Sequence, residues 1–90
     1  MDLNSKKWIF GESCTFEEVT KYFNQLNLIK MTEGVTLDFT KVKKIDTSLL
    51  SFVLEVKRKS AAFQTPINII NPPKSFHTLA KLYGVESLFR

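Results

Sequence analysis

Hydrophobic residues recur along this chain with two periodicities, one of two residues and one of about 3.6 residues. Residues 35–39 alternate apolar and polar side chains, which is typical of a strand with one buried face. Residues 15–26 instead place apolar side chains three or four positions apart, which predicts an amphipathic helix. The expected buried stripe of that helix comprises Phe16, Val19, Phe23 and Leu26.

The whole pattern predicts strands that alternate with helices. The expected strands are 8–10, 35–39 and 67–70, and the helices that follow them begin near residues 16, 47 and 75. Connections of this length favour parallel strands joined by right-handed crossovers. The strand at 67–70 is mostly apolar, so we expect both of its faces to be covered. The predicted fold is α/β, with a short, mostly parallel β-sheet covered by helices in a single domain over residues 1–90.

Polar residues mark where the predicted helices begin and end. Thr15 opens a T-x-x-E capping box ahead of the first helix. Asp46 precedes the second helix, 47–62, as an N-cap that accepts hydrogen bonds from the free N–H groups of the first turn. Ser75 is expected to cap the third helix and Gly84 to close it, after which the apolar tail packs back on the sheet.

Composition supports an ordinary globular domain. Hydrophobic residues make up 43% of the 90 positions and charged residues 24%, which excludes a disordered chain. The single cysteine allows no internal disulfide and no cysteine-based zinc site, so it indicates a reducing compartment. No apolar run is long enough for a signal peptide or a membrane span. We therefore expect a soluble, cytoplasmic protein.

The net charge of +4 coincides with that of one segment, residues 41–59. Its cations are Lys41, Lys43, Lys44, Lys57, Arg58 and Lys59. The simplest interpretation is a solvated basic face, and an alternative is a surface that meets an acidic partner or anionic lipid headgroups. Nucleic acid is disfavoured because no aromatic stacking motif accompanies the lysines.

Few residues in the chain bear chemistry that an enzyme would need. With three glycines, the sequence has neither a G-x-G-x-x-G nor a Walker A motif. His77 is the only histidine and is interpreted as a surface or boundary residue, so we expect no metal site, no cofactor and no catalytic triad. Cys14 precedes a helix start, where a thiolate is favoured, but a buried thiol is the simpler interpretation. We therefore expect a protein that is not an enzyme.

The most informative segment is the start of the second helix. On a helical wheel its core face is Leu49, Leu50, Val53, Leu54, Val56 and Ala61. Its outer face holds Thr47, Ser48, Ser51, Glu55, Arg58 and Lys59, with Phe52 at the rim. This outer face is either a solvated helix surface or a docking surface, because small hydroxyl residues let another backbone approach closely.

Phe52 has two interpretations of its own. It either completes the core or fills a pocket on a partner, and we favour the anchor because the core stripe is already full. Thr47 stands at the helix N-terminus, whose dipole favours a phosphate. That phosphate would disrupt a packed contact through bulk and charge, so Thr47 is a candidate phosphorylation switch as well as a candidate contact.

The order of strand, basic loop, Asp46-Thr47, helix, strand, Asn71-Pro72-Pro73 and helix resembles the STAS domain family. Asp46-Thr47 matches the Asp-Ser/Thr pair that stands ahead of a helix in that family. The run Thr78–Tyr83 and the stand-alone length are similar to those of the MlaB-like STAS subunits of phospholipid ABC transporters. Two features differ from the family's pattern: Leu49 stands where a glycine is common, and residues 8–14 look short for the usual hairpin.

This resemblance implies a function. MlaB-like subunits bind the ATPase subunit (MlaF-like) and support its assembly and activity in maintaining outer-membrane lipid asymmetry. Thr47 corresponds to the functional threonine at the ATPase contact, so Thr47, Ser48, Ser51, Phe52 and Glu55 are the expected partner-binding residues. The protein would then be cytoplasmic and peripheral at the inner membrane. The alternative is an anti-sigma-factor antagonist, in which the position of Thr47 is phosphorylated.

Overall fold

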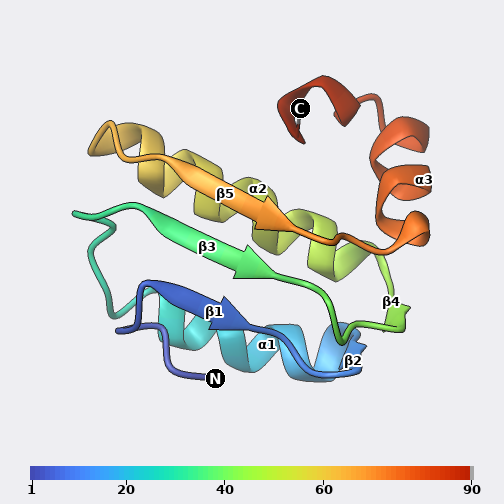
Figure 1. Ribbon diagram of the computed structural model, residues 1–90, viewed down its shortest axis with the longest axis horizontal. Helices are drawn as coiled ribbons and strands as arrows, with labels where there is room; N and C mark the ends of the chain where they lie inside the picture. The colour runs from blue at the N-terminus through green and yellow to red at the C-terminus, as the bar shows by residue number, and fades with distance from the viewer. Residues whose placement is uncertain (90) are drawn as a thin grey trace.

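The computed structural model describes residues 1–89, and its central feature is a parallel sheet with two helices behind it (Figure 1). The elements in chain order are β1 (Lys7–Ile9), β2 (Ser13–Cys14), α1 (Phe16–Leu26), β3 (Val35–Asp38), β4 (Lys44–Ile45), α2 (Thr47–Ala62), β5 (Ile67–Ile70), α3 (Lys74–Leu82) and the 3₁₀ helix η1 (Glu86–Phe89). The predicted α/β fold with a mostly parallel sheet is confirmed. The last residue of the predicted domain, Arg90, lies outside the described residues.

The main sheet has the order β1-β3-β5, and both of its pairings are parallel. Trp8 lies opposite Leu37, which in turn lies opposite Ile69. Because consecutive strands are neighbours, both crossovers proceed in the same direction and place α1 and α2 on the same face (Figure 1). A second parallel pair, β2 with β4, was not predicted and lies beyond the carboxyl ends of β1 and β3.

Within residues 1–89 no helix covers the other face of the sheet (Figure 1), so the expectation that β5 is covered on both faces is wrong. Asn68 in β5 is exposed. The side chains on this open face are Lys7, Ile9, Thr36, Asp38, Asn68 and Ile70. The third helix does not fill the gap because α3 packs at the end of the sheet, against α2 and η1.

The core lies between the sheet and the two helices. Its largest buried side chains are Trp8, Phe10, Phe39, Phe52 and Phe76. Phe52 is fully buried, with ring centroids 5.3 Å from Phe23, 5.9 Å from Tyr22 and 6.2 Å from Phe10. The favoured interpretation of Phe52 as an exposed anchor is therefore wrong. Since α1 packs beside α2, the buried arc of α2 is wider than the stripe that faces the sheet.

Two other side chains depart from the helical-wheel predictions. Phe16 is 68% exposed, although it shares a stripe with Val19 and Leu26. It is the first residue of α1, and because helical side chains tilt toward the helix N-terminus, no preceding turn lies beside it. Ala61 is exposed, and Ser60 takes a core position on α2 in its place.

The third helix begins slightly earlier than predicted. Its N-cap is Pro73, so Ser75 lies within the first turn and does not cap it. Pro73 has φ −66°, which is already close to the helical value. Gly84 follows the helix with φ +71°, a left-handed conformation that glycine adopts without strain, so its predicted role is confirmed.

The C-terminal segment packs back on the domain. The Phe89 ring centroid lies 5.1 Å from that of Phe76, and the Lys57 ammonium lies 5.8 Å from the centre of the Phe89 ring. The same ammonium donates a hydrogen bond to the carbonyl oxygen of Leu88. Within residues 1–89, none of the helices combines the length and apolarity needed to cross a bilayer.

Candidate functional site

The site begins at Asp46, which caps two helices at once. Its Oδ1 accepts hydrogen bonds from the backbone N–H of Ser48 at 2.9 Å and from the Ser48 hydroxyl. Its Oδ2 accepts a hydrogen bond of 2.9 Å from the N–H of Phe16, the first residue of α1. The predicted cap of α2 is confirmed, and the same carboxylate also joins the starts of α1 and α2.

The electrostatics of this junction follow from those contacts. Burial by itself would raise the pKa of the Asp46 carboxyl, but the hydrogen bonds from Ser48 and Phe16 hold it below its ordinary value. On α1, the N–H of Thr15, followed by the hydroxyls of Ser13 and Thr15, lowers the pKa of Glu18. Both helix starts thus carry an ionised carboxylate: Asp46 binds the N–H groups of Ser48 and Phe16, and Glu18 binds that of Thr15.

The predicted contact residues of α2 fall into three groups. Thr47 and Ser51 are exposed one turn apart on α2, as both a solvated helix surface and a docking surface require. Ser48 is half-buried, and its hydroxyl donates a hydrogen bond to the Asp46 carboxylate. Glu55 is half-buried and accepts hydrogen bonds from the Arg58 guanidinium on both carboxylate oxygens, while Phe52 lies inside the core.

A hollow of about 280 Å³ lies along this face, between α2 and the end of α3. Its lining residues are Thr47, Leu50, Ser51, Leu54, Tyr83 and Val85. The lining therefore combines two small hydroxyls with apolar side chains from α2 and from the segment directly after α3. We call these six residues the α2–α3 groove.

The apolar part of the groove continues onto side chains that the sequence interpretation missed. Leu82, the last residue of α3, is 74% exposed, and Tyr83, which caps the end of the helix, is 58% exposed. The signal was present: two consecutive large apolar residues cannot both lie on the buried stripe that already contains Phe76 and Ala80. Exposed apolar side chains that adjoin one another are a mark of an interaction surface.

The basic segment 41–59 does not form one face. Its two ends are separated by α2, whose 16 residues span about 24 Å. At the far end, Lys59 donates a 2.7 Å hydrogen bond to the carbonyl oxygen of Leu26 at the end of α1, and Lys57 binds Leu88. In the loop ahead of β4, Lys43 forms an ion pair with Glu12 at 3.8 Å. Several of these cations therefore have local structural partners.

The remaining chemical candidates are unremarkable in position. Cys14 is fully buried, and burial, with a smaller contribution from Glu18, raises the pKa of its thiol to about 11. It is therefore a protonated core residue at neutral pH. His77 is exposed on α3, with its ring 6.4 Å from that of Phe76. Over the described part of the chain, no three His, Cys, Asp or Glu side chains lie close enough to hold a metal ion.

A larger hollow, of about 440 Å³, lies at the opposite end of the molecule. It is formed by the N-terminal segment 3–8 and the loop before β3, and it includes the ion pair between Lys6 and Glu33 at 3.5 Å. The titratable side chains that line it are Lys6, Lys30 and Glu33, and they include no histidine or cysteine. The α2–α3 groove is therefore the better candidate, although it is smaller.

Comparison with known proteins supports the fold and nothing finer. Neither a protein-family model nor a curated protein matches the chain. A solved structure described as a crystal structure analysis of Mglu is similar, with a TM-score of 0.63 and 14% sequence identity. The similarity covers 81% of this chain but 19% of that one, so the chain spans about a fifth of its length. At this identity the likeness concerns the fold alone.

Proposed function

We propose that this protein is a non-catalytic STAS subunit that docks an MlaF-like ATPase of a phospholipid ABC transporter. The observation that carries the proposal is the α2–α3 groove, in which the exposed hydroxyls of Thr47 and Ser51 adjoin an apolar hollow. Small side chains let a second backbone come close, and the apolar side chains beside them stabilise the contact because water is excluded from their surface.

The groove suits a macromolecular partner better than a small substrate. Its volume of about 280 Å³ lies below the range of about 300–1,000 Å³ that is typical of small-molecule pockets. The exposed side chains of Leu82 and Tyr83 extend the apolar surface beyond the hollow, where a flat partner could cover them. A protein partner can contact both the hollow and these exposed side chains, whereas a small molecule would fill only the hollow.

The choice of partner rests on the STAS resemblance of the Asp46-Thr47 pair, the Asn71-Pro72-Pro73 turn and the run Thr78–Tyr83. In this proposal the protein has no cofactor and no activity of its own. It supports the assembly and activity of the ATPase, stays in the cytoplasm, and is peripheral at the inner membrane through the transporter. Its role in the cell is then the maintenance of outer-membrane lipid asymmetry.

One observation favours a second candidate, an anti-sigma-factor antagonist: Thr47 is exposed at a helix start, where a kinase could reach it. Against it, Asp46 already accepts the N–H of Ser48 in the first turn. A phosphate on Thr47 would find fewer free N–H groups and a neighbouring carboxylate of like charge. This argument favours Thr47 as a contact over Thr47 as a switch.

The proposal is tested by titrating the purified protein against the MlaF-like ATPase encoded in the same genome. Thr47→Glu should weaken binding about thirtyfold, because the change puts charge and bulk into a packed contact. An acidic residue in the first helical turn suits the dipole, so the free energy of unfolding should change by less than about 1 kcal/mol.

Thr32→Glu is the matched control, since Thr32 is an exposed threonine in the loop at the other end of the molecule (Figure 1). It should leave the affinity unchanged. Absence of binding by the wild-type protein, or equal losses in the two variants, would contradict the proposed function. Phosphorylation of Thr47 by an anti-sigma kinase, without ATPase binding, would establish the second candidate instead.

A further inference from the structure

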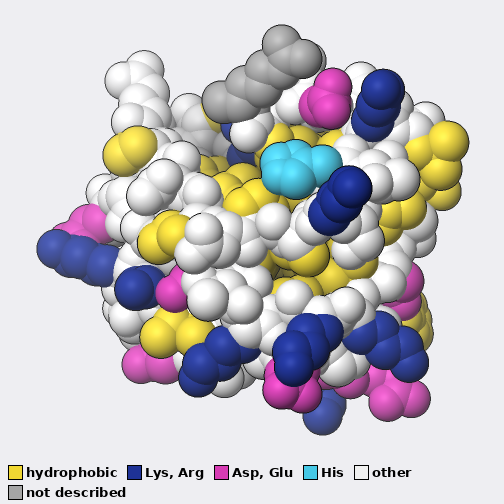
Figure 2. All heavy atoms as spheres, turned by 45° about the vertical axis from the view of Figure 1, so that its right-hand side comes forward, with side chains coloured by type: hydrophobic (Ala, Val, Ile, Leu, Met, Phe, Trp, Pro, Cys, Tyr) yellow, Lys and Arg dark blue, Asp and Glu magenta, His cyan; other side chains and the backbone are white. Residues whose placement is uncertain are grey.

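Charge does not single out a partner for this protein, but the backbone of the main sheet does. Figure 2 shows Lys and Arg side chains beside Asp and Glu side chains on one face. The two edge strands of the sheet, β1 and β5, differ instead in how their hydrogen-bonding groups are satisfied. A strand edge whose N–H and carbonyl groups lack partners is a template for pairing with another chain.

The edge at β1 is protected by its own segment. The bonds to β3 involve the carbonyl oxygen of Lys6 and the N–H of Phe10, so Lys7 turns its N–H and carbonyl groups outward. Both of these groups are hydrogen-bonded to the hydroxyl of Ser5 at 3.2 Å. The N-terminal segment also runs along this side of β1 (Figure 1). Together with the lysine side chains, these contacts block the addition of a further strand.

The edge at β5 has no such protection. β3 donates hydrogen bonds to the carbonyl oxygens of Pro66 at 3.2 Å and of Ile70 at 2.9 Å, so alternate residues of β5 face β3. Ile67 and Ile69 lie between these positions and turn their N–H and carbonyl groups outward. Within residues 1–89 these outward groups have no hydrogen-bond partner. The outer edge of β5 is therefore open to another extended chain.

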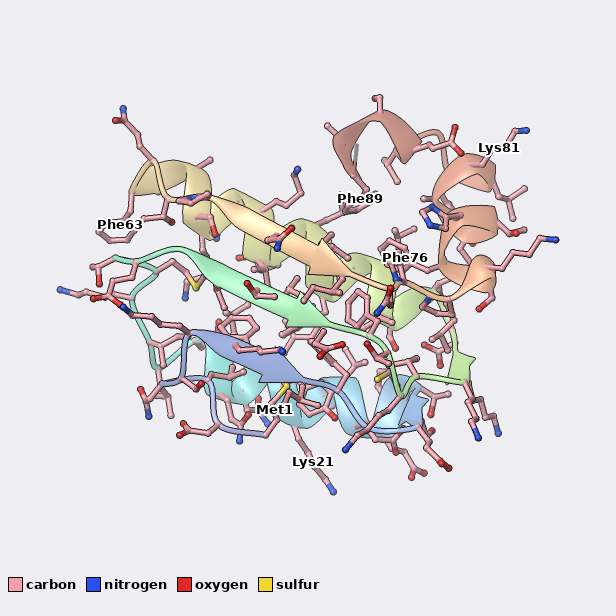
Figure 3. All side chains as sticks on the ribbon, in the orientation of Figure 1. Met1, Lys21, Phe63, Phe76, Lys81 and Phe89 are labelled. Atoms are coloured by element: carbon pink, nitrogen blue, oxygen red, sulfur yellow. The ribbon has the colours of Figure 1, made fainter. Side chains whose placement is uncertain are left out.

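A hollow of about 180 Å³ separates this edge from η1. Its lining residues are Lys57, Ile67, Asn68, Ile69, Leu88 and Phe89. Leu88 is 46% exposed, and both isoleucines are only half-buried although they face the helices. Phe89 points from η1 toward the sheet, where its ring packs on Phe76 (Figure 3). The ammonium of Lys57 is bound to the carbonyl oxygen of Leu88, so the hollow offers mainly apolar contacts.

A second copy of β5 matches this edge in geometry, charge and length. If two copies pair antiparallel about a two-fold axis at Asn68, Ile67 of each copy lies opposite Ile69 of the other, and all of their outward groups are satisfied. The isoleucines of the second copy then enter the hollow. Residues 67–70 carry no charge, so like charges do not oppose each other across the axis. Pro66 and Pro72 limit the strand to the same length in both copies.

We infer that a second copy of this chain pairs with the outer edge of β5, so that the main sheet continues from one copy into the other. The inference goes beyond the proposed function, because the hollow at β5 shares no lining residue with the α2–α3 groove. Since β5 is only four residues long, the contact is smaller than the roughly 800 Å² per partner of a stable interface. The dimer is therefore expected at high protein concentration.

Sedimentation of the whole chain tests this inference. The apparent mass should rise from that of a monomer at about 10 µM toward that of a dimer at about 1 mM, as a small interface requires. Asn68→Lys should raise the dissociation constant of the dimer at least about tenfold, because it places like charges opposite each other on the axis. Asn68 is exposed, so the fold should tolerate the change. Asn24→Lys makes the same substitution at an exposed position of α1 and should leave the dimer unchanged.

Amide hydrogen exchange of the wild-type protein gives a readout that needs no variant. At about 10 µM the N–H groups of Asn68 and Ile70 should be protected by β3, while those of Ile67 and Ile69 exchange freely. At about 1 mM the N–H groups of Ile67 and Ile69 should exchange at least about tenfold more slowly, because they become paired.

Three results would overturn the inference: a monomer at about 1 mM, a dimer that Asn68→Lys leaves intact, or exchange of Ile67 and Ile69 that does not depend on concentration. Binding of the MlaF-like ATPase is measured with the same variant. If Asn68→Lys abolishes that binding while the wild-type protein stays monomeric, the edge belongs to a strand of the ATPase and the second copy is excluded. Unchanged ATPase binding by Asn68→Lys, together with loss of the dimer, supports the inference.

Discussion

At the scale of single residues, Phe52 is the side chain on which the packing of α2 depends most. Its ring packs against Tyr22 and Phe23 of α1. It also packs against Trp8 in β1 and Phe10 just after it, and the four centroid distances lie between 5.3 and 6.4 Å. Aromatic pairs in such tilted and edge-on arrangements add to the benefit of burial. Phe52 therefore ties α2 to both α1 and the sheet.

Replacing Phe52 with alanine should cost about 3–5 kcal/mol of the free energy of unfolding, since it leaves a large cavity among rigid rings. That loss is comparable with the whole stability of a small domain, about 5–15 kcal/mol. Denaturant melts of the isolated protein measure it, with the exposed Phe63→Ala as a control that should change stability by less than about 1 kcal/mol. A small loss for Phe52→Ala would contradict the core assignment.

Ser60 presents the opposite case, a polar side chain in an apolar place. It is 2% exposed, and its hydroxyl oxygen has no hydrogen-bond partner among the described residues. A buried hydroxyl without a partner is unfavourable by about 1–3 kcal/mol. Ser60→Ala should therefore raise the free energy of unfolding by about 1 kcal/mol.

The matched control is Ser51→Ala, which makes the same change on the exposed face of the same helix. Helix propensity then affects both variants alike, and the difference between their melts isolates the effect of burial. If Ser51→Ala stabilises the protein as much as Ser60→Ala does, the Ser60 hydroxyl carries no penalty.

At the scale of elements, Asp46 makes two helix starts depend on one carboxylate. Asp46→Ala should lower the free energy of unfolding by about 2 kcal/mol, because it removes the cap of α2 and frees the N–H of Phe16 together. Glu18→Ala removes only the cap of α1 and should cost about 1 kcal/mol. Equal losses in thermal and denaturant melts would show that the bond to Phe16 contributes nothing.

The ends of α2 could be predicted to the residue, because an N-cap is a local signal that Asp46 carries in the sequence itself. The side of α2 that becomes buried could not, since Phe52 lies at the rim of the wheel and only the arrival of α1 decides its position. Phe16 is exposed for a different reason, because it is the first residue of α1, and the spacing of apolar residues does not show where the helix end lies relative to the sheet. The pair β2 and β4 consists of two-residue strands, which are too short to show any alternation.

The candidate site was predicted in part for similar reasons. Thr47 and Ser51 are small and polar in the first turns of a helix, so their exposure follows from sequence. The apolar wall of the α2–α3 groove comes from Tyr83 and Val85, more than 30 positions away along the chain. Contacts between segments that are distant in sequence depend on the topology of the fold. The local pattern of a single sequence does not show which of these segments meet.

At the scale of the whole molecule, stability should depend on pH at both extremes. The carboxyls of Glu18, Asp38, Asp46 and Glu55 have pKa values below their ordinary 4.5 or 3.8, so their contribution is complete above those values and is lost as pH falls further. The Cys14 thiol has a pKa raised to about 11 from 9.0, so stability falls as pH rises from about 9 to 11.

Denaturant melts between pH 2 and pH 11 measure this profile, which should be flat between about pH 5.5 and 8.5. Cys14→Ala should reduce the alkaline decline by up to about 2–3 kcal/mol, and Glu18→Gln should reduce the acid decline. An alkaline decline that Cys14→Ala leaves unchanged would assign it to the lysines or tyrosines and contradict the role of Cys14.

The order of the strands has a consequence for how the chain acquires its structure. Trp8 and Leu37 are 29 residues apart and Leu37 and Ile69 are 32 apart, so each pairing closes a single strand–helix–strand loop of modest length. No later strand has to insert between two earlier ones. During synthesis on the ribosome, β3 and β5 can therefore each pair with a strand that has already been made. The sheet can assemble in the direction of synthesis.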